Sequence, residues 1–165
     1  MFNIDYAALF HNFPPELATL LVAMLPIAEL RVSLPLALGA YHLPLGSAAF
    51  YSFVGNILPV FFLLWLLEPV SNFFRRKSRL LDRFFTWLFS RTRRKFEGGA
   101  KKYGLLIALA IFVGIPLPMT GAWTGAVAAF LFNIPYKKAL LSIAAGVVMA
   151  GLIVLAVYYG ILSLF

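Results

Sequence analysis

A glutamate and an arginine stand two positions apart, Glu29 and Arg31, within an otherwise apolar stretch from Leu17 to Leu45. Ionisable groups are costly inside a hydrophobic segment, so they mark a candidate functional site. The carboxylate could take and release a proton while the guanidinium fixes an anionic group of a substrate. The two could also form a purely structural salt bridge. Burial disfavours a charged carboxylate and a nearby guanidinium favours it, so the sequence leaves both readings open.

A second polar group, without charge, stands in the other half of the chain. Thr120, Trp123 and Thr124 lie among small residues there, close to Gly121. This group could form a polar half-site that faces the charged pair, because free backbone amides at a helix start can receive an anion. The alternative is close helix packing in which the hydroxyls bond to backbone.

Other kinds of site find little support. Asn56 is a secondary candidate, although a buried asparagine also serves as a hydrogen bond between helices. The chain has no cysteine, and its two histidines have no companions at metal-ligand spacing. Phosphate-binding glycine loops and catalytic triad patterns are missing too. We therefore expect neither an enzyme nor a bound metal or cofactor.

Composition indicates a membrane protein. Of the 165 residues, 62% are hydrophobic and 12% charged, and the mean hydropathy is +0.92. This leaves too little polar surface to coat a soluble globule. The net charge is +8, and 11 of the 14 Lys and Arg residues lie between Arg75 and Lys102. Such clustering concerns topology and lipid rather than nucleic acid.

Four apolar segments are expected to form helices in the membrane. Two are long enough to cross a bilayer without interruption, Leu45–Leu67 and Ala139–Leu162. The other two, Leu17–Tyr41 and Leu105–Phe132, are interrupted at their centres. Proline removes an amide donor and clashes with the preceding turn, so each interrupted segment is expected to be two half-helices. The predicted hairpin breaks are Pro26, Pro35, Pro116, Pro118 and Gly121.

The order of segments predicts two repeats in a single membrane domain. Pro44 and Pro135 each precede a span, and the same offset of 91 (135 minus 44) relates Gly55 to Gly146. The predicted parts are repeat one at about 15–69, a linker at about 70–99 and repeat two at about 100–163. Gly98 and Gly99 are expected to form a flexible joint before the second repeat.

Charge favours re-entrant hairpins over full crossings. The basic linker should be cytoplasmic, and four full crossings would then place Lys137 and Lys138 outside, against the positive-inside rule. If each interrupted segment instead returns to its own side, these lysines stay inside and the acidic N-terminal segment lies outside. An odd number of crossings per half makes the repeats inverted, a recurring transporter plan. Both termini are then expected outside.

The linker is predicted to be an amphipathic helix on the anionic inner leaflet. Phenylalanines and leucines recur in it at near-helical spacing. Basic residues stand between them, and each contributes about 1 kcal/mol of attraction to anionic lipid. The expected lipid contacts are Arg75, Arg76, Arg79 and Arg83.

Two stretches carry a family resemblance. PIAELRVSLPLALG, from Pro26 to Gly39, and IPLPMTGAWTG, from Ile115 to Gly125, resemble the putative small multidrug export protein family, a distant relative of the DedA membrane proteins. Met119 departs from the glycine more usual there. The resemblance implies paired re-entrant hairpins, a transport role and a bacterial or archaeal plasma membrane. A second hairpin arginine found in DedA proteins is missing, which weakens the analogy to their anionic lipid substrates.

Three functional hypotheses follow. The first is a secondary transporter, coupled to protons, that exports a small amphipathic or lipid-like substrate through a midplane site between the two hairpins. The second is a flippase or scramblase of lipids or lipid carriers. The third is a non-transporting structural membrane protein. Two spans and two hairpins bury little surface, so a homo-oligomer is expected, with a dimer as the default.

Overall fold

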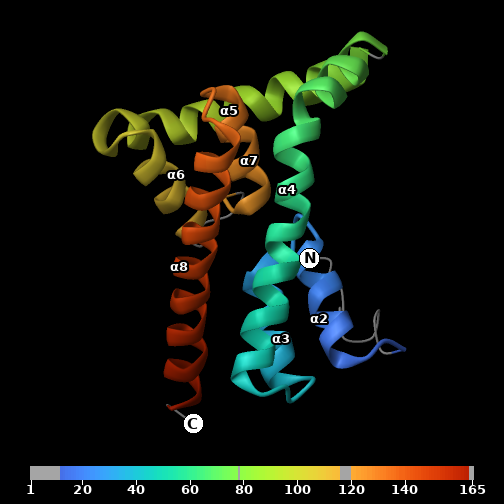
Figure 1. The fold of residues 1–165 in the computed structure, drawn as a ribbon, viewed down its shortest axis with the longest axis vertical. Coiled ribbons are helices and arrows are strands. Elements are labelled where there is room, and N and C mark those ends of the chain that lie inside the picture. Colours follow the sequence, from blue (N-terminus) through green and yellow to red (C-terminus); the bar gives the residue numbers. More distant parts are fainter. Residues whose placement is uncertain (1–11, 78, 116–119, 164–165) are drawn as a thin grey trace.

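The fold is entirely helical over the part of the chain that the structure describes. The computed structural model describes residues 12–77, 79–115 and 120–163, and within these ranges it contains seven helices and no strand (Figure 1). In chain order the helices are α2 (Pro15–Met24), α3 (Glu29–Gly39), α4 (Leu45–Lys77), α5 (Arg79–Tyr103), α6 (Leu105–Gly114), α7 (Ala122–Leu131) and α8 (Tyr136–Leu162). The prediction of an all-α protein is confirmed.

Two long helices, α4 and α8, run through the molecule in opposite directions (Figure 1). Each holds a stretch long and apolar enough to cross a bilayer, Leu45–Leu67 and Tyr136–Ile161. Only 33% and 28% of the most apolar window in each stretch is buried inside the protein. A core helix of a water-soluble protein would be mostly buried, whereas an exposed apolar helix needs lipid around it. Both predicted spans are therefore confirmed as candidate membrane helices.

Four short helices form two pairs that pack on the long ones. Helices α2 and α3 contact α4, and α6 and α7 contact α8. Each pair also reaches across to the other half, because α3 contacts α8 and α7 contacts α4. In Figure 1 the α2–α3 pair lies beside the lower part of α4 and the α6–α7 pair beside the upper part of α8. The ends of α2 and α6, where the chain turns, face the middle of the molecule.

Proline acts differently at the two predicted breaks of the first pair. Helix α2 ends at Met24 and exposed Pro26 lies in the turn before α3, as expected of a break. Pro35 instead lies inside α3, so the prediction that it interrupts the helix is wrong. A proline costs one hydrogen bond, here to the carbonyl of Arg31, and packing against three neighbouring helices keeps α3 intact. Pro116 and Pro118 lie outside the described residues.

Helix α5 lies across one end of the molecule (Figure 1). It begins later than the predicted linker because α4 continues to Lys77, through Pro59 and Pro69. It also continues through Gly98 and Gly99 to Tyr103, so the predicted joint at these glycines is wrong. Gly99 lies where α5 packs on α6, and a Cβ built on it would lie 3.6 Å from that of Ala108.

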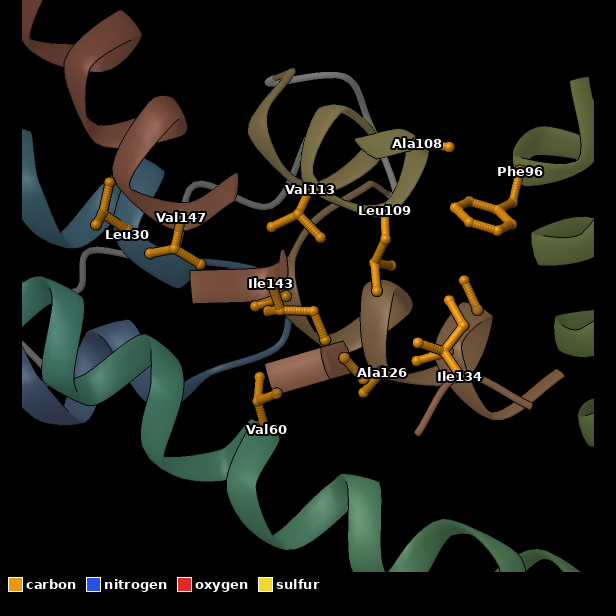
Figure 2. Close-up of a cluster of buried hydrophobic side chains, with 14 of the residues drawn as sticks. Leu30, Val60, Phe96, Ala108, Leu109, Val113, Ala126, Ile134, Ile143 and Val147 are labelled. Carbon is orange, nitrogen blue, oxygen red and sulfur yellow. The ribbon is translucent and has the colours of Figure 1, made fainter. Parts of the chain in front are cut away.

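The hydrophobic core draws on both halves. Figure 2 shows Leu30 of α3 and Val60 of α4 converging with Val113, Ile143 and residues of α7 on one cluster. Phe96 of α5 closes the cluster at its far side, and its ring lies 4.8 Å from that of Phe132, centroid to centroid. The core therefore fixes the hairpins, the long helices and α5 relative to one another.

Local geometry recurs at the offset read from the sequence. His42 and Asn133 each have a φ of 51°, and 133 minus 42 is 91. A Cβ on Gly55 of α4 would lie 2.8 Å from the Cβ of Ala23 on α2, and a Cβ on Gly146 of α8 would lie 2.7 Å from that of Val113 on α6. The first short helix of each pair thus presses on its long helix at a matching glycine.

Candidate functional site

The two charged residues, Glu29 and Arg31, lie at the tip of the first helix pair. Glu29 begins α3, and its backbone N–H donates to the carbonyl of Leu25, 3.0 Å away. Its φ of 50° lies in the left-handed region, which a residue with a side chain seldom adopts. The side chain is only 6% exposed. Strained, buried, ionisable residues of this kind concentrate at functional sites.

The carboxylate of Glu29 points to the start of α7 in the other pair. Its Oε1 accepts a long hydrogen bond of 3.4 Å from the backbone N–H of Trp123, and the amide of Ala122 interacts with it too. No side chain from α7 itself caps this helix. A negative charge is stabilised there because the first amides of a helix lack internal partners and the helix dipole is positive at that end.

Gly121 makes this approach possible. A Cβ on Gly121 would overlap the Glu29 carboxylate, and the φ of the glycine is +156°. Any side chain at position 121 would therefore push the carboxylate away from the helix start. Gly121, predicted to be a hairpin break, therefore also leaves the space that the Glu29 carboxylate occupies.

Arg31 reaches the opposite kind of helix end. Its Nη2 donates to the carbonyl of Val113, 3.5 Å away, and to Oγ1 of Thr120, 3.4 Å away. Val113 stands next to the last residue of α6, where carbonyls lack helical partners and the dipole is negative. Thr120 is held in turn by donating its hydroxyl to the carbonyl of Ile115, at 2.9 Å.

The two charges also interact with each other. Glu29 and Arg31 attract electrostatically, and each is matched to one helix end of the second pair. The arrangement can hold a carboxylate and a guanidinium out of water without leaving either uncompensated. A buried carboxyl in this setting could exchange a proton, and the guanidinium could accept a second anion whenever the carboxyl is neutral.

The remaining predicted residues occupy varied places. Thr124 turns to its own helix start and donates to the carbonyl of Gly121, at 3.2 Å. Trp123 lines an apolar cavity of about 270 Å³ against α4, and its buried Nε1 has no hydrogen-bond partner among the described residues. Asn56 is buried in α4, 3% exposed, away from lipid. The structure thus brings Glu29, Arg31, Thr120 and Trp123 together.

Sequence reasoning missed several residues near this site. Ser33 and Ser52 are fully buried, yet neither was singled out. Their spacing carries a signal, because Ser33 stands one helical turn after Glu29 and Ser52 one turn before Asn56. The carbonyl of Val113, which accepts from Arg31, has no sequence signal because any residue could supply it.

A second cavity borders the site on the α5 side. It measures about 280 Å³ and lies between α5 and α6, with Phe96, Ile111 and Phe112 in its wall. Lys95 and Tyr103, both residues of α5, also line the cavity. Thr120, whose hydroxyl oxygen accepts a hydrogen bond from Arg31, forms part of the lining too. The cavity therefore offers apolar surface next to the charged tip, with a cationic residue on the α5 side.

The linker helix presents a basic surface. Arg83, Arg93 and Arg94 are exposed on α5, whereas Arg75, Arg76 and Arg79 have side chains that lie outside the described part of the structure. Glu97 forms an exposed salt bridge of 2.9 Å with Lys101 one turn away. The hydrogen bond from Lys101 lowers the pKa of the Glu97 carboxyl. The described residues contain no group of three or more His, Cys, Asp or Glu that could hold a metal ion.

Comparison with known proteins identifies the family. The family described as "Putative small multi-drug export protein" matches residues 29–153, a region that begins at Glu29 and contains the candidate span Leu45–Leu67 and most of the span Tyr136–Ile161. No curated protein and no solved structure matches the chain. The matched region covers most of the 165 residues. The chain therefore belongs to the putative small multi-drug export protein family.

Proposed function

We propose that this protein is a proton-coupled membrane exporter of small amphipathic molecules, with its site where the two hairpin tips meet. The observation that carries the proposal is the pairing of Glu29 with the start of α7 and of Arg31 with the end of α6. Family membership supports an export role, because the family is one of export proteins rather than enzymes. The geometry of the two tips supports the proposed coupling ion and substrate class.

The proposed topology has two inverted repeats, each a re-entrant hairpin followed by a span. Opposite directions of α4 and α8, and hairpins beside opposite ends of them, support this topology (Figure 1). Lys137 and Lys138 begin α8 at the end where basic α5 lies, which agrees with one cytoplasmic face for all of them. The outer face then holds the 40–44 turn and both termini.

The proposed coupling is a competition for Arg31. While Glu29 is charged, it neutralises Arg31, and the site does not bind a second anion. A proton taken by the Glu29 carboxylate removes that counter-charge, and Arg31 can then bind an anionic group of a substrate. Loss of the proton restores the pair and expels the anion. In this scheme the anion binds only while Glu29 carries a proton, so proton and anion cross the membrane together, and export of the anion carries a proton outward with it.

The apolar part of the substrate has a place beside the charges. The 280 Å³ cavity reaches Thr120, so a molecule whose anionic group meets Arg31 could rest its apolar body against Phe96 and Phe112. Ligand sites are mostly apolar with a few polar anchors, as this one is. We infer a substrate that joins a compact apolar body to one anionic group.

Transport in proteoliposomes tests the proposal. We expect a pH gradient with the acidic side outside the proteoliposomes to drive uptake of the anionic dye 8-anilinonaphthalene-1-sulfonate more strongly than that of cationic ethidium. Glu29→Gln should abolish the gradient-driven flux. Glu97→Gln removes an exposed carboxylate of α5 and should leave the flux unchanged, which makes it the matched control. Unchanged flux in the Glu29 variant would refute the proton role.

A second candidate function has its own support. The 280 Å³ cavity adjoins α5, whose basic surface suits the anionic leaflet, so a lipid or lipid-carrier flippase is the alternative. Such an activity would move a fluorescent phospholipid between leaflets without any imposed gradient. If neither assay shows transport and Glu29→Gln only lowers thermal stability, the charged pair is structural.

A further inference from the structure

Three buried oxygens on α3 and α4 lack hydrogen-bond partners among the described residues: Oγ of Ser33, Oγ of Ser52 and Oδ1 of Asn56. Both serines are 0% exposed and Asn56 is 3% exposed. An unpaired buried polar group is destabilising, and the membrane offers no solvent to relieve it. Each of these three atoms, on two neighbouring helices, therefore needs a partner that the described protein residues do not supply.

The polar groups stand at matching heights. Helices α3 and α4 pack together and are joined by the 40–44 turn at one end of the molecule (Figure 1). At about 1.5 Å per residue, Ser33 and Ser52 both lie roughly 9–10 Å from the ends of their helices at that turn. Glu29 and Asn56 both lie roughly 15–16 Å from it. Polar side chains thus occur at two heights between the turn and the carboxylate: Ser33 and Ser52 lie nearer the turn, and Asn56 lies level with Glu29.

The polar residues on both helices, Glu29 and Ser33 on α3 and Ser52 and Asn56 on α4, face the protein interior. Asn56 stands one turn before Val60, whose side chain points into the core shared with α7 and α8 (Figure 2). Ser33 stands one turn after Glu29, which is itself buried. These polar side chains therefore lie within the protein and are shielded from lipid.

We propose that these oxygens bind a file of water that links Glu29 to the face of the 40–44 turn. The inference rests on the proposed proton role of Glu29. Water suits the site because serine hydroxyls donate and accept while the amide oxygen accepts, and each water offers two donors. A metal cation suits it less, because Arg31 already places a positive charge beside the carboxylate.

The file gives a proton its route. A hydronium in the file transfers its proton to the Glu29 carboxylate, which leaves one neutral carboxylic acid and one water. The reverse step returns the proton to the file. Ser33 and Ser52 hold the water nearer the turn, and Asn56 holds the water level with the carboxylate. These residues position the water and do not themselves change protonation.

The charged surroundings of Glu29 are simple. Arg31 is the cation that acts on it, and helices α6 and α7 carry no titratable side chain. The titratable residues of the other helices packed against α3 are Glu16 on α2, Tyr51 on the described stretch of α4, and Tyr136, Lys137, Lys138, Tyr158 and Tyr159 on α8. Among the described residues, Glu29 is the buried carboxyl, and the comparison with Glu29→Gln assigns a pH-dependent carboxyl signal to it.

Time-resolved infrared spectroscopy of the full chain in lipid nanodiscs tests the water file. After a pH jump, the buried carboxyl band should change in the unaltered protein and be missing in Glu29→Gln. We expect the double variant Ser33→Ala/Ser52→Ala, and separately Asn56→Leu, to slow the change at least tenfold. Thermal stability should not fall in the serine double variant, because the two hydroxyls that it removes have no hydrogen-bond partner among the described residues. Thr19→Val is the matched control, since this buried hydroxyl already donates to the carbonyl of Pro15 at 2.7 Å.

Each outcome decides a separate point. An unchanged rate in the serine and Asn56 variants, with a band that still titrates, would overturn the water file and leave the exporter proposal standing. A band that never responds to pH in the unaltered protein would overturn the proton role and the water file together. A tenfold slowing that Thr19→Val shares would also overturn the file, because the effect would then be one of packing.

Discussion

The two hairpin tips share a place in the fold but differ in chemistry. The first tip carries Glu29 and Arg31, and the second carries no charge among its described residues. The second instead offers two helix ends, a start at α7 for the carboxylate and an end at α6 for the guanidinium. One tip thus supplies full charges and the other supplies the partial charges that stabilise them. Two similar elements can complete a single site when one of them alone becomes charged.

The largest expected effect comes from breaking the charged tip. Arg31→Gln would strand the buried Glu29 carboxylate, and we expect it to lower the free energy of unfolding by about 3 kcal/mol. Adding Glu29→Gln should recover part of the loss, with a coupling of about 1 kcal/mol or more. Thermal unfolding of the four proteins in detergent measures the cycle. Strictly additive effects would show that the two charges act independently.

A somewhat smaller effect is expected from the uncharged tip. Gly121→Ala would place a Cβ against the Glu29 carboxylate at a φ of +156°. We expect a loss of about 2 kcal/mol from backbone strain and displacement of the carboxylate. Gly98→Ala is the control, because nothing lies within 4 Å of a Cβ there and the residue is inside α5. Equal melting temperatures for the two variants would contradict the account.

The next test compares how the two halves are packed. Gly55→Ala and Gly146→Ala should each cost about 1–3 kcal/mol, because each new methyl would meet the neighbouring short helix. Gly46→Ala and Gly160→Ala are controls on the same two long helices, with open space around the added Cβ. The comparison is made by thermal unfolding. A cost at one glycine only would show that the halves pack by different means.

The smallest effect is expected at the second tip's hydroxyls. Thr120→Val removes an acceptor for Arg31 and should cost about 1 kcal/mol, with a measurable fall in gradient-driven dye flux. Thr124→Val removes only a local bond to the carbonyl of Gly121, so its flux should stay closer to that of the unaltered protein. If the Thr124 variant loses more flux than the Thr120 variant, Thr120 is not the hydroxyl that serves the charged pair.

The sequence predicted the long elements well because they depend on apolar length. Leu45–Leu67 contains an uninterrupted apolar run, and the structure has a candidate span with the same bounds. The sequence predicted local breaks less well because tertiary packing overrides them. Pro35 lies within α3, and Gly98 and Gly99 lie within α5, since neighbouring helices hold both segments.

Candidate site residues were predictable where their chemistry is unusual. Glu29 and Arg31 stand out as charges in an apolar run, and Thr120 stands out as a hydroxyl beside a break. The partners of these residues were harder to foresee. The carbonyl of Val113 accepts from Arg31 across 82 positions of sequence, and nothing in the identity of a valine predicts that contact.

The central claim is that the charged tip enters the membrane from one face and the uncharged tip from the other. Because the chain has no cysteine, single variants His42→Cys and Lys137→Cys can be labelled with an impermeant maleimide in sealed vesicles of known orientation. Both positions are exposed, one at the turn before α4 and one at the start of α8. The proposed topology predicts that the two cysteines react from opposite faces. Reaction of both from the same face would contradict it and restore four full crossings.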